Sequence, residues 1–209
     1  MSGFASDAPF PPYGRVLDEI AQAGYEGTEL GDWGFLPTDP EVLNQALRSR
    51  GLSLVGALVP WPLADAAMHK DAIDTALRTA RLLASAPASD EARPFVILAD
   101  DNGADATRTS LAGRIRPEHG LTPAQWKTFA AGAAAVARAV RDETGLRTVV
   151  HHHCAGFVET PEETDRFLDL TDPGLVGLCF DTGHYAYAGG DALAGLKRYG
   201  DRAWHVHFK

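Results

Sequence analysis

Residues 175–184 read LVGLCFDTGH, and residues 203–209 read AWHVHFK. Each stretch is a short apolar run with an acid or histidines at its end, and the segment between them, 191–199, has helical spacing. A helix that joins two strands in this way requires a parallel sheet, in which the carboxyl ends of the strands meet at one edge. The two stretches therefore predict a parallel α/β fold with polar side chains gathered at that edge.

The same alternation of strand and helix extends back along the chain. Asp39 before Pro40 is a typical helix start, and Gly51 is a typical helix stop. The predicted strands are nearly continuous apolar runs, as in sheets covered on both faces. With 175–180 and 203–208 they make six strands, which we interpret as a single domain over 1–209. The other predicted elements are helices at 13–23, 40–50, 65–86, 122–144 and 161–170 and strands at 27–30, 52–59, 95–99 and 147–153.

One segment, 100–120, departs from this rhythm because it is rich in Asp, Arg, Gly and Thr. It follows a strand, so a loop here lies on the face where the carboxyl ends of the strands point. Loops of this length are usually functional or mobile. A lid over the site and a disordered insertion are both open interpretations.

Composition narrows the class of partner. The 19 Lys and Arg against 28 Asp and Glu give a formal net charge of -9, which disfavours nucleic acid and anionic membranes. No run reaches the roughly 18 apolar residues of a membrane span, and the first residues lack a signal-peptide pattern. The two cysteines, Cys154 and Cys179, suit free thiols in a reducing compartment. We expect a cytoplasmic protein with a small-molecule substrate and neither a nucleic-acid nor a membrane partner.

Histidines recur with the period of a strand. His205 and His207 share one face, and so do His151 and His153 of the triplet 151–153. Two imidazoles on one face of a buried strand are hard to explain by packing, although a polar strand end is an alternative for the triplet.

A carboxylate accompanies these histidines. Asp181 and His184 follow a third strand, where an ordinary turn is the alternative. Mixed nitrogen and oxygen donors suit zinc, manganese, cobalt or iron(II) rather than calcium. The chain shows neither a phosphate-binding glycine loop nor a serine nucleophile elbow, so a metal site is the favoured chemistry.

Four further residues are candidates for the same site at the carboxyl ends of the strands. Glu29 ends an early strand, where it either faces inward or bonds to a neighbouring strand end. Glu159 follows the histidine triplet and either reaches the site or belongs to a helix start. Trp61 either walls a sugar-sized pocket or packs under a loop, and Lys209 directly follows the last strand.

Together these segments resemble the xylose isomerase-like TIM-barrel superfamily of sugar isomerases and epimerases, most closely its inosose dehydratase-like branch. The resemblance implies a (β/α)8 barrel with a divalent metal ion, Mn, Co, Zn or Mg, at its carboxyl-terminal mouth. It is carried, in the family's order, by the segments 24–31 (GYEGTELG), 34–37 (GFLP), 151–160, 177–191 and 201–209.

The resemblance also implies roles by position. Asp181 and His207 look like metal ligands, and His184 looks like a substrate-contacting catalytic group. A family glutamate ligand is replaced by a histidine, for which we take His153, with His151 as the alternative; Glu159 then has the spacing of a second functional acid. The full expected set is His153, Asp181 and His207 on the metal, His184, Glu159 and Lys209 in catalysis, and Glu29, Trp61, His151 and His205 on the substrate.

Family members have a strand before the first helix seen here and another after the last strand seen here. Residues 1–4 read as the loop that would follow such a first strand. We therefore expect an incomplete barrel of about six of eight strands, with the first and last missing. Weak metal affinity, or a homo-oligomer that covers the sheet edges, is the expected consequence.

The resemblance implies a metal-dependent enzyme that acts on a small polyol, cyclitol or keto sugar through enolisation. Inosose dehydration and sugar isomerisation or epimerisation share that first step, and the histidine triplet favours dehydration. An apurinic-endonuclease-like DNA repair enzyme is an alternative, although such sites need more histidines on early strands and the net charge opposes DNA. A non-catalytic sugar-binding relative is the other alternative.

Overall fold

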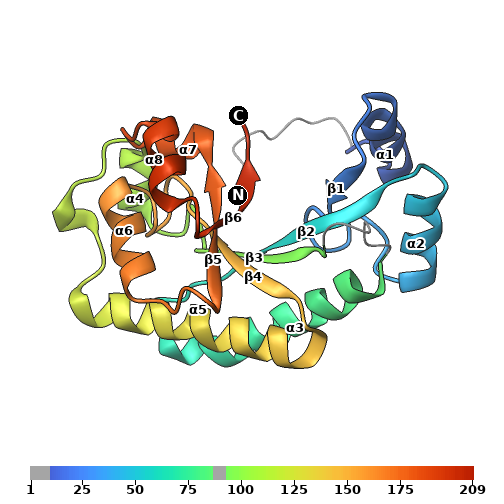
Figure 1. Cartoon of the computed structure of the whole chain (residues 1–209). Helices are drawn as coiled ribbons and strands as arrows, with labels where there is room; N and C mark the ends of the chain where they lie inside the picture. Colours follow the sequence, from blue (N-terminus) through green and yellow to red (C-terminus); the bar gives the residue numbers. More distant parts are fainter. Residues whose placement is uncertain (1–9, 87–92) are drawn as a thin grey trace.

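The computed structural model describes residues 10–86 and 93–209. Its centre is one six-stranded sheet in which every strand pairs, in parallel, with the next along the chain. The sheet curls so that helices cover its convex side, as part of a barrel does (Figure 1). This confirms the predicted six-stranded parallel fold. The strands are β1 (Gly27–Glu29), β2 (Ser53–Pro60), β3 (Phe95–Ala99), β4 (Arg147–His151), β5 (Val176–Asp181) and β6 (Ala203–His207).

Helices begin where the sequence places capping side chains. Asp39 accepts from the backbone N–H groups of Glu41 and Val42, and Thr122 and Thr160 each form a capping box. The helices are α1 (Tyr13–Gln22), α2 (Pro40–Arg48), α3 (His69–Ser85), α4 (Ala106–Leu111), α5 (Pro123–Thr144), α6 (Pro161–Asp169), α7 (Thr182–Tyr187) and α8 (Ala192–Tyr199), with 3-10 turns η1 (Ala66–Met68) and η2 (Pro117–His119).

Residues 100–120 differ from the expected long irregular loop, because they contain α4 and η2. Asp105 caps α4 by accepting from the N–H of Arg108. The Arg108 side chain is 1% exposed, and its two terminal nitrogens lie 2.8 and 2.7 Å from the carboxylate oxygens of Glu163. A buried ion pair therefore anchors this segment to α6, and the disordered-insertion interpretation is wrong.

Two further boundaries differ from expectation. Strand β4 ends at His151, so His152 and His153 lie beyond it, and α7 forms directly after β5. Residues 1–4, expected to be a loop, lie outside the described part of the chain.

Buried apolar side chains cover both faces of the sheet. The main core fills the space between the strands and the helices, and a smaller cluster of Ile97, Val149 and Cys179 lies on the concave face with Phe95 and Trp204. Side chains alternate between the two faces of the sheet, so residues two positions apart on a strand lie on the same face. On the concave face, the residues two positions after the apolar cluster form a second layer. This layer contains the polar side chains at the carboxyl ends of the strands.

Candidate metal centre

Asp181 is the centre of the polar layer. It ends β5, its side chain is 0% exposed, and its Oδ1 accepts from the backbone N–H of His184 at 2.9 Å. Its Oδ2 lies 3.2 Å from His151 Nε2, 3.6 Å from His207 Nδ1 and 3.9 Å from His184 Nε2. The Lys209 ammonium also donates to Oδ2. Three predicted strand ends therefore converge on one carboxylate oxygen.

Three of these atoms have the spacing of a metal's ligands. His151 Nε2 and His207 Nδ1 lie 3.2 Å apart, and both face Asp181 Oδ2 at 3.2 and 3.6 Å. A tetrahedral ion with bonds of about 2.0–2.1 Å holds its ligand atoms about 3.4 Å apart. Two imidazole nitrogens approach this closely only when a proton or a cation lies between their lone pairs. The donor set and its spacing fit a divalent ion.

Glu29 orients one of the histidines. Its Oε1 accepts from His207 Nε2 at 2.8 Å and from His205 Nε2 at 2.9 Å, so the two edge strands, β1 and β6, meet across the concave face. With its Nε2–H donated to Glu29, His207 turns Nδ1 toward Asp181. Metal-binding histidines commonly have this carboxylate partner. Glu29 thus faces the concave side, as the first interpretation expects, and is hydrogen-bonded there to β6, the opposite edge strand.

The charges of the cluster follow from these contacts. Burial alone would raise the pKa of Asp181, but hydrogen bonds from His151, His207 and Lys209 outweigh it and hold that pKa far below its usual range. Burial likewise opposes the hydrogen bonds from His205 and His207 that lower the pKa of Glu29 to about 2. Both carboxylates are therefore anionic at neutral pH.

The imidazoles divide into charged and neutral groups. Hydrogen bonds to Asp181 and then to Cys179 and Glu29 raise the pKa of His207 to about 11. Burial, followed by the nearby His153, lowers the pKa of His184 to about 4. His184 is thus a neutral base at the rim.

His151 reaches Asp181, whereas His153 points elsewhere. The His153 Nδ1 donates to the carbonyl of Cys154 at 2.5 Å, and its ring centroid is 3.8 Å from that of His184. Among residues 10–86 and 93–209, the groups with metal-like spacing do not include His153. Besides the triangle of His151, Asp181 and His207, these groups are His151, Asp181 and His184; His151, Cys179 and His207; and Glu29, His205 and His207.

His152 and Cys179 were missed as site residues by the sequence reasoning. His152 is buried, and its Nε2 accepts from the backbone N–H of Asp181 at 2.9 Å, so it fixes the end of β5. Its place opposite His151 and His153 in the strand period was the available signal for a supporting role. Cys179 lies two residues before Asp181 on the same face, a relation that the same period could have revealed.

Glu159 is buried among backbone amides. Its Oε1 accepts from the N–H of Gly113 at 2.7 Å, and its Oε2 accepts from the N–H of Ala155 at 2.7 Å. Ala155 has a φ of 70°, a left-handed conformation that this hydrogen bond holds in place. The structure thus makes Glu159 a tether between the α4 segment and the loop that follows β4.

Trp61 lies apart from the histidines. Its Nε1 donates to the carbonyl of Met68 at 2.9 Å, and its ring lines a cavity of about 200 Å³ with Leu30 and Arg78. Trp61 therefore both lines a cavity and bonds to the carbonyl of Met68, and its contact with substrate stays a prediction.

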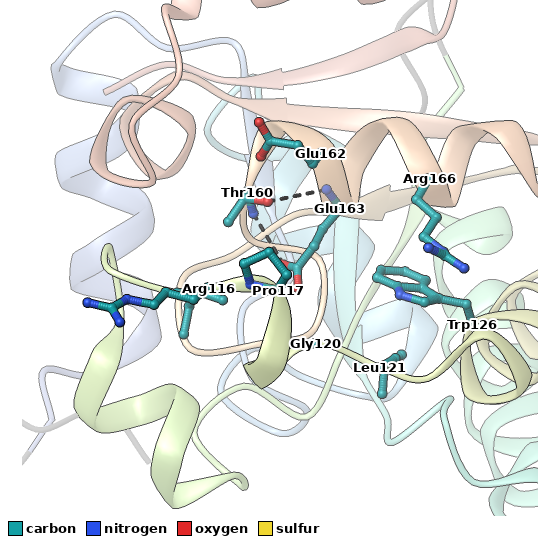
Figure 2. A pocket seen from close by; sticks show the side chains of 10 residues that line it. Arg116, Pro117, Gly120, Leu121, Trp126, Thr160, Glu162, Glu163 and Arg166 are labelled. Atoms are coloured by element: carbon teal, nitrogen blue, oxygen red, sulfur yellow. Dashed lines mark hydrogen bonds between the residues drawn. The ribbon is translucent and has the colours of Figure 1, made fainter.

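A cavity of about 500 Å³ lies between η2, α5 and α6, where Figure 2 shows Arg116, Trp126 and Arg166 around it. The two Thr160–Glu163 hydrogen bonds of the α6 capping box border the same cavity. Its lining contains none of the strand-end histidines. Donor geometry therefore marks the candidate site, and this cavity is a separate feature.

Comparison with known proteins agrees with the curled parallel sheet and its strand-end cluster. Residues 17–209 match the family described as xylose isomerase-like TIM barrel. The chain belongs to this family. The fold and the family resemblance expected from the sequence are both confirmed, with six parallel strands as an incomplete barrel of the xylose isomerase-like type.

Several proteins are similar to this xylose isomerase-like chain. An inosose dehydratase of Clostridium perfringens is 34% identical over 202 residues, covering 93% of this chain and 62% of the relative. The chain thus spans less than two thirds of that relative's length. A 3-keto-D-glucoside 4-epimerase from E. coli has a TM-score of 0.72 at 18% identity, covering 97% of this chain and 76% of that one. The IolI protein with a bound zinc atom has a TM-score of 0.65 at 13% identity, covering 94% and 66%.

In the described part of the chain, every helix is too short or too polar to cross a membrane.

Proposed function

We propose that this chain carries the active site of a divalent-metal-dependent enzyme that removes water from an inosose-like keto cyclitol. The observation that carries the proposal is the triangle of His151 Nε2, His207 Nδ1 and Asp181 Oδ2, with edges of 3.2, 3.2 and 3.6 Å. Similarity to inosose dehydratases supports the substrate class. The zinc atom in the structure of the similar IolI protein supports a divalent ion as the bound group.

Asp181, His151 and His207 would hold the ion, with Glu29 orienting His207. A divalent ion here would supply Lewis acidity that polarises a carbonyl and a neighbouring hydroxyl, which makes the adjacent C–H more acidic.

The chain's own side chains would then move protons. His184 is partly buried, and burial lowers its pKa to about 4, so it is unprotonated at neutral pH and able to take the proton from carbon. Its Nε2 lies 3.9 Å from Asp181 Oδ2, within reach of a substrate bound beside that carboxylate. Lys209, whose side chain is 53% exposed at the rim, would return a proton to the departing hydroxyl, which leaves as water.

The test uses the purified chain, stripped with a chelator and reloaded separately with Mn²⁺, Co²⁺, Zn²⁺ or Mg²⁺. Each sample is incubated with an inosose, with formation of the unsaturated product followed by absorbance, and with ketoses in D₂O, with proton exchange followed by NMR. We expect metal-dependent loss of water from the inosose, abolished by Asp181→Ala. Exchange in ketoses alone, or inosose dehydration that is indifferent to chelation, would overturn the proposal.

A further inference from the structure

Cys179 is a thiol that the proposed reaction does not use. It lies in the middle of β5, its side chain is 0% exposed, and it forms no disulfide. Its register partners are His151 on β4 and His205 on β6. The thiol therefore lies directly beneath the layer of Asp181, on the same face of the same strand.

The His151 and His207 rings lie close to two possible metal ligands on β5, Asp181 and Cys179. One donor atom each of His151, Cys179 and His207 lies within 4.8 Å of the others, a group of the same kind as His151, Asp181 and His184. Asp181 thus offers a hard oxygen at the upper end of the strand and Cys179 a soft sulfur below it. Nitrogen and sulfur donors together favour zinc and similar ions over magnesium.

We propose that Cys179 Sγ is a metal ligand, which joins His151 and His207 in binding a borderline or soft divalent ion such as Zn²⁺, Co²⁺ or Cd²⁺. This inference rests on the proposed metal site and assigns its ion class. On coordination a sulfur–metal bond forms, the S–H bond breaks, and the proton leaves to solvent, so the ion keeps its oxidation state. The ion enters from the rim, where His207 is 22% exposed.

Cys154 provides a matched control. It is the chain's other cysteine and is also buried, but its Sγ faces the carbonyl of His184 at 3.6 Å. It belongs to none of the metal-like groups found in the described ranges. Cys154→Ser and Cys179→Ser therefore make the same chemical change at a site outside and a site inside the cluster.

The first measurement is X-ray absorption of the zinc-loaded wild-type chain, which needs no variant to fold. We expect one sulfur at about 2.3 Å beside nitrogen and oxygen at about 2.0–2.2 Å. The second is the near-ultraviolet thiolate-to-cobalt charge-transfer band of the Co²⁺-loaded chain. Wild type and Cys154→Ser should show it, and Cys179→Ser should lose it.

The outcomes separate this inference from the proposed function. Stoichiometric zinc binding through nitrogen and oxygen alone, or a band that survives in Cys179→Ser, would overturn the sulfur ligand and leave the proposed metal site standing. Absence of binding of Zn²⁺, Co²⁺, Mn²⁺ and Mg²⁺ by equilibrium dialysis would overturn both.

Discussion

Replacing Arg108 with alanine removes the cation that anchors α4. Its guanidinium makes two hydrogen bonds to Glu163 at 2.8 and 2.7 Å and one to the carbonyl of His119 at 3.2 Å. Removing one partner of a buried ion pair costs about 3–5 kcal/mol, because the other charge is left buried. Glu163 keeps two backbone donors, the N–H groups of Glu159 and Thr160, so the lower end of that range applies. We expect a loss of about 3 kcal/mol in the free energy of unfolding.

The assay is reversible urea unfolding together with thermal unfolding. For a chain of this size, about 3 kcal/mol lowers the melting temperature by roughly 6–12 °C. Native-state hydrogen exchange should show the extra opening in α4, because that helix loses its only buried ion pair among the described contacts. Arg15→Ala is the control, since the Arg15–Glu19 pair is exposed, and we expect no measurable shift in its midpoint.

A double-mutant cycle then isolates the pair. Glu163→Gln retains an oxygen for the backbone donors but removes the charge, so Arg108→Ala combined with it leaves no lone buried ion. The double variant should be more stable than the sum of the two single losses predicts, with a coupling of about 2 kcal/mol. A cost below about 1 kcal/mol for Arg108→Ala, or additive losses, would refute the buried-pair argument.

Three other outcomes are expected. Burial lowers the pKa of His152 to about 3, whereas the pKa of this imidazole in the unfolded chain is near 6.5. The free energy of unfolding should therefore fall as pH drops from about 6.5 toward 3, by up to about 5 kcal/mol. His152→Gln keeps a hydrogen-bond acceptor and should flatten this part of the stability–pH curve measured by urea unfolding. Gly113→Ala should destabilise more than Gly24→Ala in thermal melts, because both have positive φ but a Cβ at 113 would meet the Tyr187 ring at 2.6 Å, and equal losses would contradict this packing. Glu29→Gln should weaken metal binding by about 10–100-fold in titration calorimetry with an unchanged circular dichroism spectrum, and unchanged affinity would remove its orienting role.

The sequence predicted the parts of this fold that depend on local patterns. Apolar runs and a cap such as Asp39 predicted most elements within a few residues, because a cap satisfies backbone donors within its own helix turn. The period of two placed Asp181 and His207 at strand ends. Helix α4 was missed because its stability comes from Arg108 and Glu163, which are 55 residues apart in the chain.

Long-range pairing also explains what the sequence could not decide within the site. Whether His151 or His153 faces Asp181 depends on where β4 stops, and it stops at His151 because that residue is the last to pair with β5. The contact between Glu29 and His207 spans 178 residues and depends on how strongly the sheet curls. The sequence pattern of a strand contains no information on how strongly the sheet curls. The sequence therefore marked Glu29 as an inward-facing candidate but did not show that it orients His207.

The same curl brings a buried carboxylate, Asp181, and a partly buried one, Glu29, to the same histidine, His207. Asp181 and Glu29 together carry two negative charges, and His207, protonated by its neighbours, and Lys209 carry two positive ones against them. The cluster is neutral as it stands, so the donor atoms can lie 3.2–3.6 Å apart without net repulsion. A divalent ion supplies the same two charges if His207 gives up its proton and the Lys209 ammonium moves from Asp181 to the open rim, where it can reach a substrate. Ion binding at this site is therefore an exchange of cations around fixed anions. His207 should release one proton for each ion bound, and Cys179 a second one where its sulfur is a ligand.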